Sequence, residues 1–144
     1  GGEVVPWRKL RSLFRILRDP VVLGLLVDWG YRAEDVPVRL FGAWTTLPAG
    51  PAVLAARTRA LLVPVACRRR PDGRYVAQHL APIEVAEGTP AAIARATQAV
   101  ADAVESMVGQ APAQWYTFKP MWPATAEESA ALERRAAAML AGQA

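Results

Sequence analysis

The chain has 144 residues, 53% of them hydrophobic and 21% charged, and a formal net charge of +4. This length and composition exclude a disordered chain and predict one domain with a buried core. The single cysteine, Cys67, excludes a disulfide framework, and the single histidine, His79, excludes a metal site with two or more histidines. We therefore expect no metal.

The first predicted elements are a short strand over residues 3–6 and an amphipathic helix over residues 7–18. The helix prediction rests on apolar residues at positions i, i+3, i+4 and i+7. These are Leu10, Leu13, Phe14 and Leu17. A second stripe on the same helix is basic and comprises Arg8, Arg11, Arg15 and Arg18. The helix should end at Asp19, because a residue before proline avoids the helical conformation.

Residues 21–27, VVLGLLV, form a continuous apolar run with turn signals on both sides. This pattern predicts a strand that is buried on both faces, as in a parallel sheet. The run ends at Asp28. Residues 36–41 alternate weakly and predict another strand, which Pro37 places at the edge of a sheet. Residues 42–46 should form a loop.

A short helix is predicted over residues 52–58, with Pro51 in its first turn, where the missing N–H does no harm. Residues 61–67, LLVPVAC, predict a second buried strand, and residues 74–85 predict its partner. The polar turn between these two strands, residues 68–73, contains an Asp-Gly turn signal.

Thr89 and Pro90 begin a long alanine-rich helix, which should end near Gly109. An aromatic segment follows over residues 113–123. A last helix is predicted over residues 125–140, because a capping-box sequence, T-x-x-E, stands at its start. The order of strands and helices predicts an α/β fold with a mostly parallel or mixed sheet flanked by helices.

Few residues are candidates for catalytic chemistry. The sequence contains neither a glycine-rich nucleotide-binding motif nor a G-x-S-x-G nucleophile motif. Cys67 ends a predicted apolar strand, and we favour a small buried hydrophobe over a nucleophile. His79 and Glu84 have the spacing of an H-x4-E pair, but on a strand they face opposite sides, and Pro82 lies between them. We therefore assign no catalytic role to His79.

Two further features each allow two interpretations. Asp28 stands at the expected carboxyl end of a central strand, where open α/β sheets bind their ligands. It could equally cap the next turn. Residues 47–51, LPAGP, lead into a helix N-terminus that could bind an anion such as a phosphate. A helix start that binds nothing is the favoured interpretation of this segment.

The basic stripe on residues 7–18 also has two interpretations. It is either an ordinary solvated face of the helix or a face that attaches to an anionic membrane, where each basic residue contributes about 1 kcal/mol. Nucleic acid is the rival partner. The arginine stripe carries no aromatic side chains as stacking platforms, and no nucleic-acid motif is present, so we expect no nucleic acid.

A resemblance to a known family rests on segments that occur in a fixed order. They are residues 25–28 (LLVD), 36–42 (VPVRLFG), 47–52 (LPAGPA), 60–65 (ALLVPV) and 112–115 (PAQW), with Trp122 seven residues further on. The chain resembles the carboxyl-terminal part of bacterial lipid acyltransferases of the lipid A lauroyl/myristoyl type. It is most similar to the actinobacterial branch, the phosphatidylinositol mannoside acyltransferases. The resemblance covers residues 1–123, and residues 124–144 form a helix outside it.

The resemblance implies a partial glycerolipid-acyltransferase-like fold. It also implies an enzyme that transfers a fatty acyl chain from acyl-CoA or acyl carrier protein to a hydroxyl of a membrane glycolipid, without a cofactor. In this family a histidine of an H-x4-D or H-x4-E motif takes the proton from the acceptor hydroxyl. That motif belongs to the amino-terminal half of the family's proteins. We therefore expect this chain to be a fragment that has no catalytic residue of its own and is inactive alone.

The resemblance also implies which residues of this chain bind substrate: Asp28, Phe41, Gly42, Pro48, Gly50 and Arg69. Asp28 matches an acid that helps to hold the acceptor or the active-site loop. Arg8, Arg11, Arg15 and Arg18 would fit peripheral attachment to the anionic, cytoplasmic face of the cell membrane. The alternative function is a non-catalytic membrane- or lipid-binding module on the same scaffold.

Overall fold

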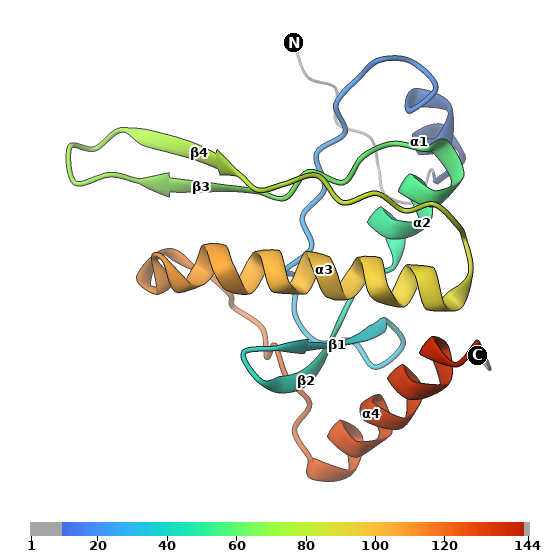
Figure 1. Cartoon of the computed structure of the whole chain (residues 1–144). Helices are drawn as coiled ribbons and strands as arrows, with labels where there is room; N and C mark the ends of the chain where they lie inside the picture. The colour runs from blue at the N-terminus through green and yellow to red at the C-terminus, as the bar shows by residue number, and fades with distance from the viewer. Residues whose placement is uncertain (1–9, 143–144) are drawn as a thin grey trace.

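A computed structural model describes residues 10–142 of the chain (Figure 1). The elements follow in the order α1 (Leu10–Ile16), β1 (Val36–Leu40), β2 (Ala43–Leu47), α2 (Gly50–Thr58), β3 (Val65–Arg69), β4 (Tyr75–His79), α3 (Pro90–Gly109), the 3-10 turn η1 (Pro112–Gln114) and α4 (Ala126–Leu140). The predicted strand over residues 3–6 lies outside the described residues.

The long helix α3 is the centre of the fold and packs against β1, α2 and α4 (Figure 1). It begins where the sequence predicts, because the Thr89 hydroxyl accepts a hydrogen bond of 3.2 Å from the backbone N–H of Ala92. The predicted capping box of α4 is also confirmed: Thr125 and Glu128 each accept from the other's backbone N–H. The helices predicted over residues 7–18 and 52–58 are confirmed as α1 and α2 in the part of the chain that the structure describes.

The strands β1 and β2 form an antiparallel hairpin in which Val36 pairs with Leu47. The prediction of a strand over residues 36–41 is confirmed, but the predicted loop over residues 42–46 is wrong. Residues 43–46 belong to β2 because the chain reverses earlier, at a two-residue turn made by Phe41 and Gly42. Both have a left-handed backbone, with φ of 50° and 78°, which matches the twist of a tight hairpin.

The predicted parallel or mixed sheet is wrong for the described residues, which form two antiparallel sheets of two strands each. Residues 21–27, predicted as its central strand, are extended but belong to no sheet. Val22 is 99% exposed and Leu26 86% exposed. The apolar run supplies side chains suited to burial, but a strand also needs a neighbour for its N–H and C=O groups. No described segment fills that place.

The strands β3 and β4 form a second hairpin, which projects from the body of the molecule (Figure 1). The predicted turn is confirmed, with Gly73 at φ 83°. Its first strand, β3, continues beyond the predicted end at residue 67 to Arg69. The predicted burial of residues 61–67 on both faces is wrong, because one face of this segment is left uncovered by the described residues: Leu61 is 54% exposed and Val65 56% exposed. Cys67 is likewise exposed, which contradicts its interpretation as a buried hydrophobe.

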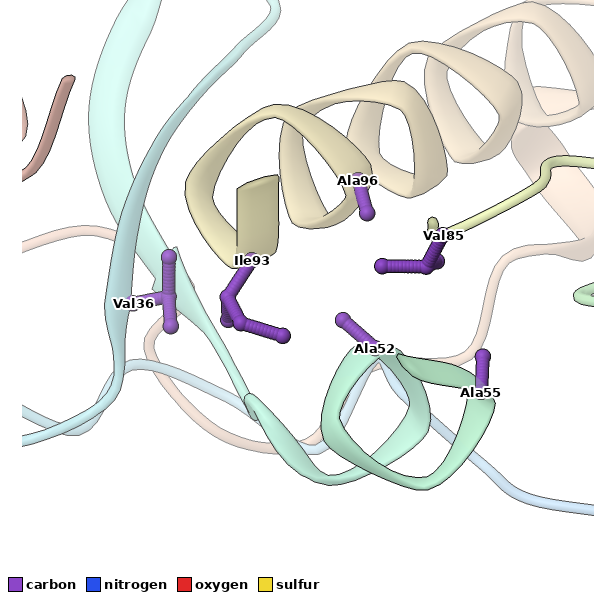
Figure 2. Packing of buried hydrophobic residues seen from close by; sticks show 6 residues of the cluster. All are labelled: Val36, Ala52, Ala55, Val85, Ile93 and Ala96. Carbon is purple, nitrogen blue, oxygen red and sulfur yellow. The ribbon is translucent and has the colours of Figure 1, made fainter. Parts of the chain in front are cut away.

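The core divides into two clusters around α3. The first joins β1, α2, the Val85 region and α3 through small side chains (Figure 2): Val36, Ala52, Ala55, Val85, Ile93 and Ala96. The second cluster lies between the β1–β2 hairpin, α3 and the aromatic segment: Val38, Leu40, Leu47, Ala101 and Met121. Alanine lets the helices approach closely, so the composition of the chain serves the packing directly.

The last helix, α4, is joined to the core by side chains and by polar contacts. Its buried residues are Leu132 and Ala136, and it packs against α3, β1 and β2. The guanidinium of Arg135 donates to the backbone carbonyls of Ala33 and Asp35. Among residues 10–142, no helix combines the length and the hydropathy needed to cross a membrane.

Candidate functional site

The carboxylate of Asp28 is half-buried and accepts a hydrogen bond from the indole of Trp115. The distance from Trp115 Nε1 to Asp28 Oδ2 is 3.0 Å, between residues 87 positions apart. A hydrogen bond to a charged acceptor is stronger than one between neutral groups. This contact therefore holds the acid at the end of the apolar run in one place.

The chain on either side of this contact is held by further interactions between the same two segments. Tyr31 N donates to the carbonyl of Pro120 at 2.8 Å, and the Lys119 ammonium lies 4.2 Å from the centre of the Trp29 ring. Gly30 has φ of 116°, and a Cβ at this position would lie 2.8 Å from Cβ of Lys119. Only glycine meets both conditions, so Gly30 lets the two segments approach.

Trp115 also stands in a cluster of aromatic rings. Its centroid is 5.8 Å from that of Phe41 and 6.5 Å from that of Trp122, and the contact with Trp122 is edge-to-face. Phe41 holds its left-handed conformation because its N–H donates to Glu105 Oε2 at 2.6 Å while its ring packs on Trp115. Such a conformation is unusual for a bulky residue and is kept only where its surroundings compensate for it.

A groove of about 360 Å³ runs from Asp28 and Trp115 along α3. One wall is the segment 25–28, the second is the start of β3, and the floor is the carboxyl-terminal half of α3. Its apolar lining comes from Leu25, Leu26, Val27, Val65, Val104, Met107 and Val108. A smaller recess of about 170 Å³ continues this lining toward Leu23 and residues 61–64. Polar side chains of Asp28, Arg68, Gln114 and Tyr116 line the same groove, so its lining combines apolar and polar groups.

A second recess, of about 490 Å³, lies beside the β3–β4 hairpin. Its lining is basic and aromatic and comprises Cys67, Arg69, Arg70, Pro71, Tyr75, Gln114 and Tyr116. The Gln114 side chain closes the recess by bonding the backbone of Arg69 twice: its Oε1 accepts from Arg69 N at 2.8 Å and its Nε2 donates to Arg69 O at 3.0 Å. Gln114 precedes Trp115, so one short segment connects the two recesses.

The structure brings some of the predicted site residues together and leaves others apart. Asp28 and Phe41 both contact Trp115. The backbone of Arg69 bonds to Gln114, the residue before Trp115. Pro48 lies beside Val27, on the other side of the extended segment. Gly42 and Gly50 are exposed, and a Cβ on either would meet no atom within 4 Å. These two glycines line neither recess.

The predicted membrane face can be followed only in part. The side chains of Arg15 and Arg18 are exposed, at and after the end of α1. The side chains of Arg8 and Arg11 lie outside the described part. His79 is exposed on β4 and lines neither recess.

Sequence reasoning missed several residues that build the site. Trp115 and Gln114 belong to the PAQW segment, which contributed to the resemblance but was not assigned to the site. Glu105 and Gln98 stand seven apart on α3, on one face, and both bond the backbone of the β1 edge. The seven-residue spacing of these two polar side chains on a predicted helix was the signal in the sequence, but it did not show which strand they contact. Within residues 10–142, no three His, Cys, Asp or Glu side chains gather where they could hold a metal.

A groove lined by apolar and polar side chains, with a basic recess beside it, suits an amphipathic ligand that carries a long apolar chain and hydroxyl or anionic groups. The chain belongs to the bacterial lipid A biosynthesis acyltransferase family, whose model matches residues 1–123. The resemblance to this family, drawn from the sequence, is confirmed.

Two curated relatives illustrate the similarity. The chain is 34% identical over 136 residues to a phosphatidylinositol mannoside acyltransferase of Mycolicibacterium smegmatis, covering 94% of this chain and 41% of that protein. It is 35% identical over 130 residues to a phosphatidylinositol mannoside acyltransferase of Mycobacterium tuberculosis, covering 90% of this chain and 39% of that protein. The chain therefore spans about two fifths of the length of these relatives.

Proposed function

We propose that this chain is the carboxyl-terminal part of an acyltransferase that moves a fatty acyl chain from acyl-CoA or acyl carrier protein to a hydroxyl of a membrane glycolipid. The observation that carries the proposal is the Asp28–Trp115 contact in the wall of the groove along α3. Membership of the family and the similarity to the mycobacterial enzymes support it. Residues 124–142 add α4, which packs on the same core.

In this proposal the groove along α3 holds the acyl chain. Each buried methylene contributes about 0.8 kcal/mol, so a lining of Leu, Val and Met side chains binds a chain without needing a specific polar contact. In the proposal the thioester carbon lies near Asp28, whose carboxylate is one of the polar groups that line the groove. The basic recess at Arg69 and Arg70 accepts an anionic group of the donor or acceptor.

Asp28 is proposed to orient the acceptor. Its Oδ2 is occupied by Trp115, whereas Oδ1 forms no hydrogen bond to the described residues. That second oxygen can accept from a hydroxyl of the glycolipid. The acceptor oxygen attacks the thioester carbon, the carbon–sulfur bond breaks, and the thiol leaves. The base that removes the hydroxyl proton must come from outside this chain, since its one histidine, His79, lies away from the groove.

The activity test compares the chain alone with a reconstituted enzyme. The 144-residue chain should transfer no acyl group from acyl-CoA to a phosphatidylinositol mannoside acceptor. Co-expression with the part of the Mycolicibacterium smegmatis relative that lies outside the match should restore transfer, because that part supplies the base. The relative's own matched part, co-expressed in the same way, is the positive control. Turnover by the chain alone at the rate of the control would contradict the proposal.

The basic face of α1 is proposed to attach the enzyme to an anionic membrane. We expect the double variant Arg15→Ala, Arg18→Ala to bind vesicles rich in anionic lipid about 30-fold more weakly, since each arginine contributes about 1 kcal/mol near such a surface. Vesicle sedimentation at low and high salt measures the effect, which salt should screen. The variant Arg95→Ala, Arg134→Ala removes two exposed arginines elsewhere and is the matched control. Equal losses in both variants would refute the assignment of this face.

A further inference from the structure

The extended apolar segment over residues 21–27, called the edge segment below, has an unused capacity for hydrogen bonding. Residues 22–28 form no backbone–backbone hydrogen bond with other described residues. Seven consecutive residues therefore offer their N–H and C=O groups to a neighbour. Most backbone groups in folded proteins are paired, and an exposed strand edge is a template for another strand.

The side chains of the edge segment show the two-residue period of a strand. Val22 and Leu26 are 99% and 86% exposed. On the other face Leu25 is 43% exposed and Leu23 and Val27 are half-buried, and all three line the apolar recess beside α3. One face thus packs in part on this chain, and the other is an apolar surface without cover from the described residues. Exposed contiguous apolar surface of this kind marks an interaction site.

We propose that the edge segment becomes an internal β-strand by pairing with a strand of the part of the longer acyltransferase that lies outside these 144 residues. Three observations point to this occupant. The sequence pattern is that of a strand buried on both faces. The backbone of the segment belongs to no helix or strand and is unpaired within the described residues. More than half of the length of each curated relative lies outside the match. The inference rests on the proposed function, because it takes the chain to be one part of a larger enzyme.

Two other occupants fit the segment less well. A lipid bilayer would cover Val22 and Leu26 but would leave the backbone groups of the segment without partners, which hydrocarbon does not tolerate. A second copy of this chain would bring together two molecules that each carry a net charge of +4. A polypeptide strand from a different part of the enzyme satisfies the backbone and covers the exposed face.

Amide hydrogen–deuterium exchange tests the pairing directly. In the 144-residue chain alone, the amides of residues 22–27 should exchange fast. In the complex with the unmatched part of the Mycolicibacterium smegmatis relative they should exchange about 100-fold more slowly, as amides in a sheet do. Unchanged exchange in a purified complex would overturn the inference. So would slow exchange in the chain alone, whether from its own remaining residues or, if light scattering shows a dimer, from a second copy.

A matched pair of variants at Gly24 separates strand pairing from mere contact. A Cβ at this position meets no atom within 4 Å, so neither variant should change the melting temperature of the chain alone. Gly24→Pro removes the amide donor and should weaken the complex at least 10-fold, whereas Gly24→Ala keeps the donor and should not. Equal affinities of the two variants would overturn the pairing.

The readouts distinguish this inference from the proposed function. A complex with protected amides at residues 22–27 that transfers no acyl group would support strand pairing and contradict the acyltransferase proposal. A complex that transfers the acyl group while these amides stay fast would do the reverse. Absence of any complex, while the relative's own matched part forms one, would overturn the inference. Binding of the edge segment to neutral vesicles in place of the polypeptide would overturn it as well.

Discussion

Asp28→Asn in the reconstituted acyltransferase should lower kcat/KM for glycolipid acylation by about 10- to 100-fold. The substitution keeps the size of the side chain but removes its charge, and a hydrogen bond to a charged group is worth about 1.5–3 kcal/mol. The proposed acceptor hydroxyl would lose its charged partner at Oδ1, while the contact with Trp115 becomes a neutral one. Initial rates at several acceptor concentrations measure the effect.

Trp115→Phe is the companion variant for Asp28→Asn. It removes the indole N–H and one fused ring, and should lower kcat/KM only about 5-fold, because the carboxylate proposed to bind the acceptor keeps its charge and loses only its positioning partner. If Asp28 served only to hold Trp115, both single variants and the double variant would lose the same amount. We expect instead that Asp28→Asn has the larger effect, with vesicle binding unchanged. An unaltered kcat/KM in Asp28→Asn would remove Asp28 from the site.

Leu40→Ala should destabilise the chain by about 2–5 kcal/mol in urea unfolding, the range for a leucine truncated in a packed core. Leu40 is fully buried on β1, where it packs with Leu47 and Met121 beneath α3. Its backbone carbonyl also accepts from Trp122 Nε1 at 3.3 Å, so a shift of β1 would disturb the aromatic cluster around Trp115. Loss of stability and a change in tryptophan fluorescence should therefore occur together.

Leu26→Ala makes the same truncation on the edge segment and should change the stability of the chain alone by less than about 0.5 kcal/mol. Leu26 is 86% exposed, so its removal leaves no cavity. A loss as large as that of Leu40→Ala would mean that the edge segment is buried in the chain alone, and would contradict its exposed placement. In the reconstituted complex, by contrast, Leu26→Ala should be destabilising, because the proposed strand covers this face.

Helices were the part of the fold that local patterns determined best. Thr89 and Thr125 cap α3 and α4 as expected, because a cap is a contact between residues three positions apart. The turn at Gly73 was predicted for the same reason. The β2 strand was missed, since its buried Thr45 and Thr46 look like loop residues. Their hydroxyls donate to the distant carbonyls of Met121 and Arg32, and the Thr46 hydroxyl also accepts from the N–H of Arg32.

For the candidate site, too, local sequence patterns predicted some features, and contacts between distant segments determined the others. Short segments in a fixed order identified the family, and the place of Asp28 after an apolar run singled out this residue. The same run indicated that residues 21–27 suit a strand buried on both faces. The folded chain was needed to show that Trp115, 87 residues away, is the partner of Asp28, and that the edge segment has no neighbour within the described residues. Apolar periodicity indicates which side chains favour burial, whereas pairing depends on which distant segments the fold brings together.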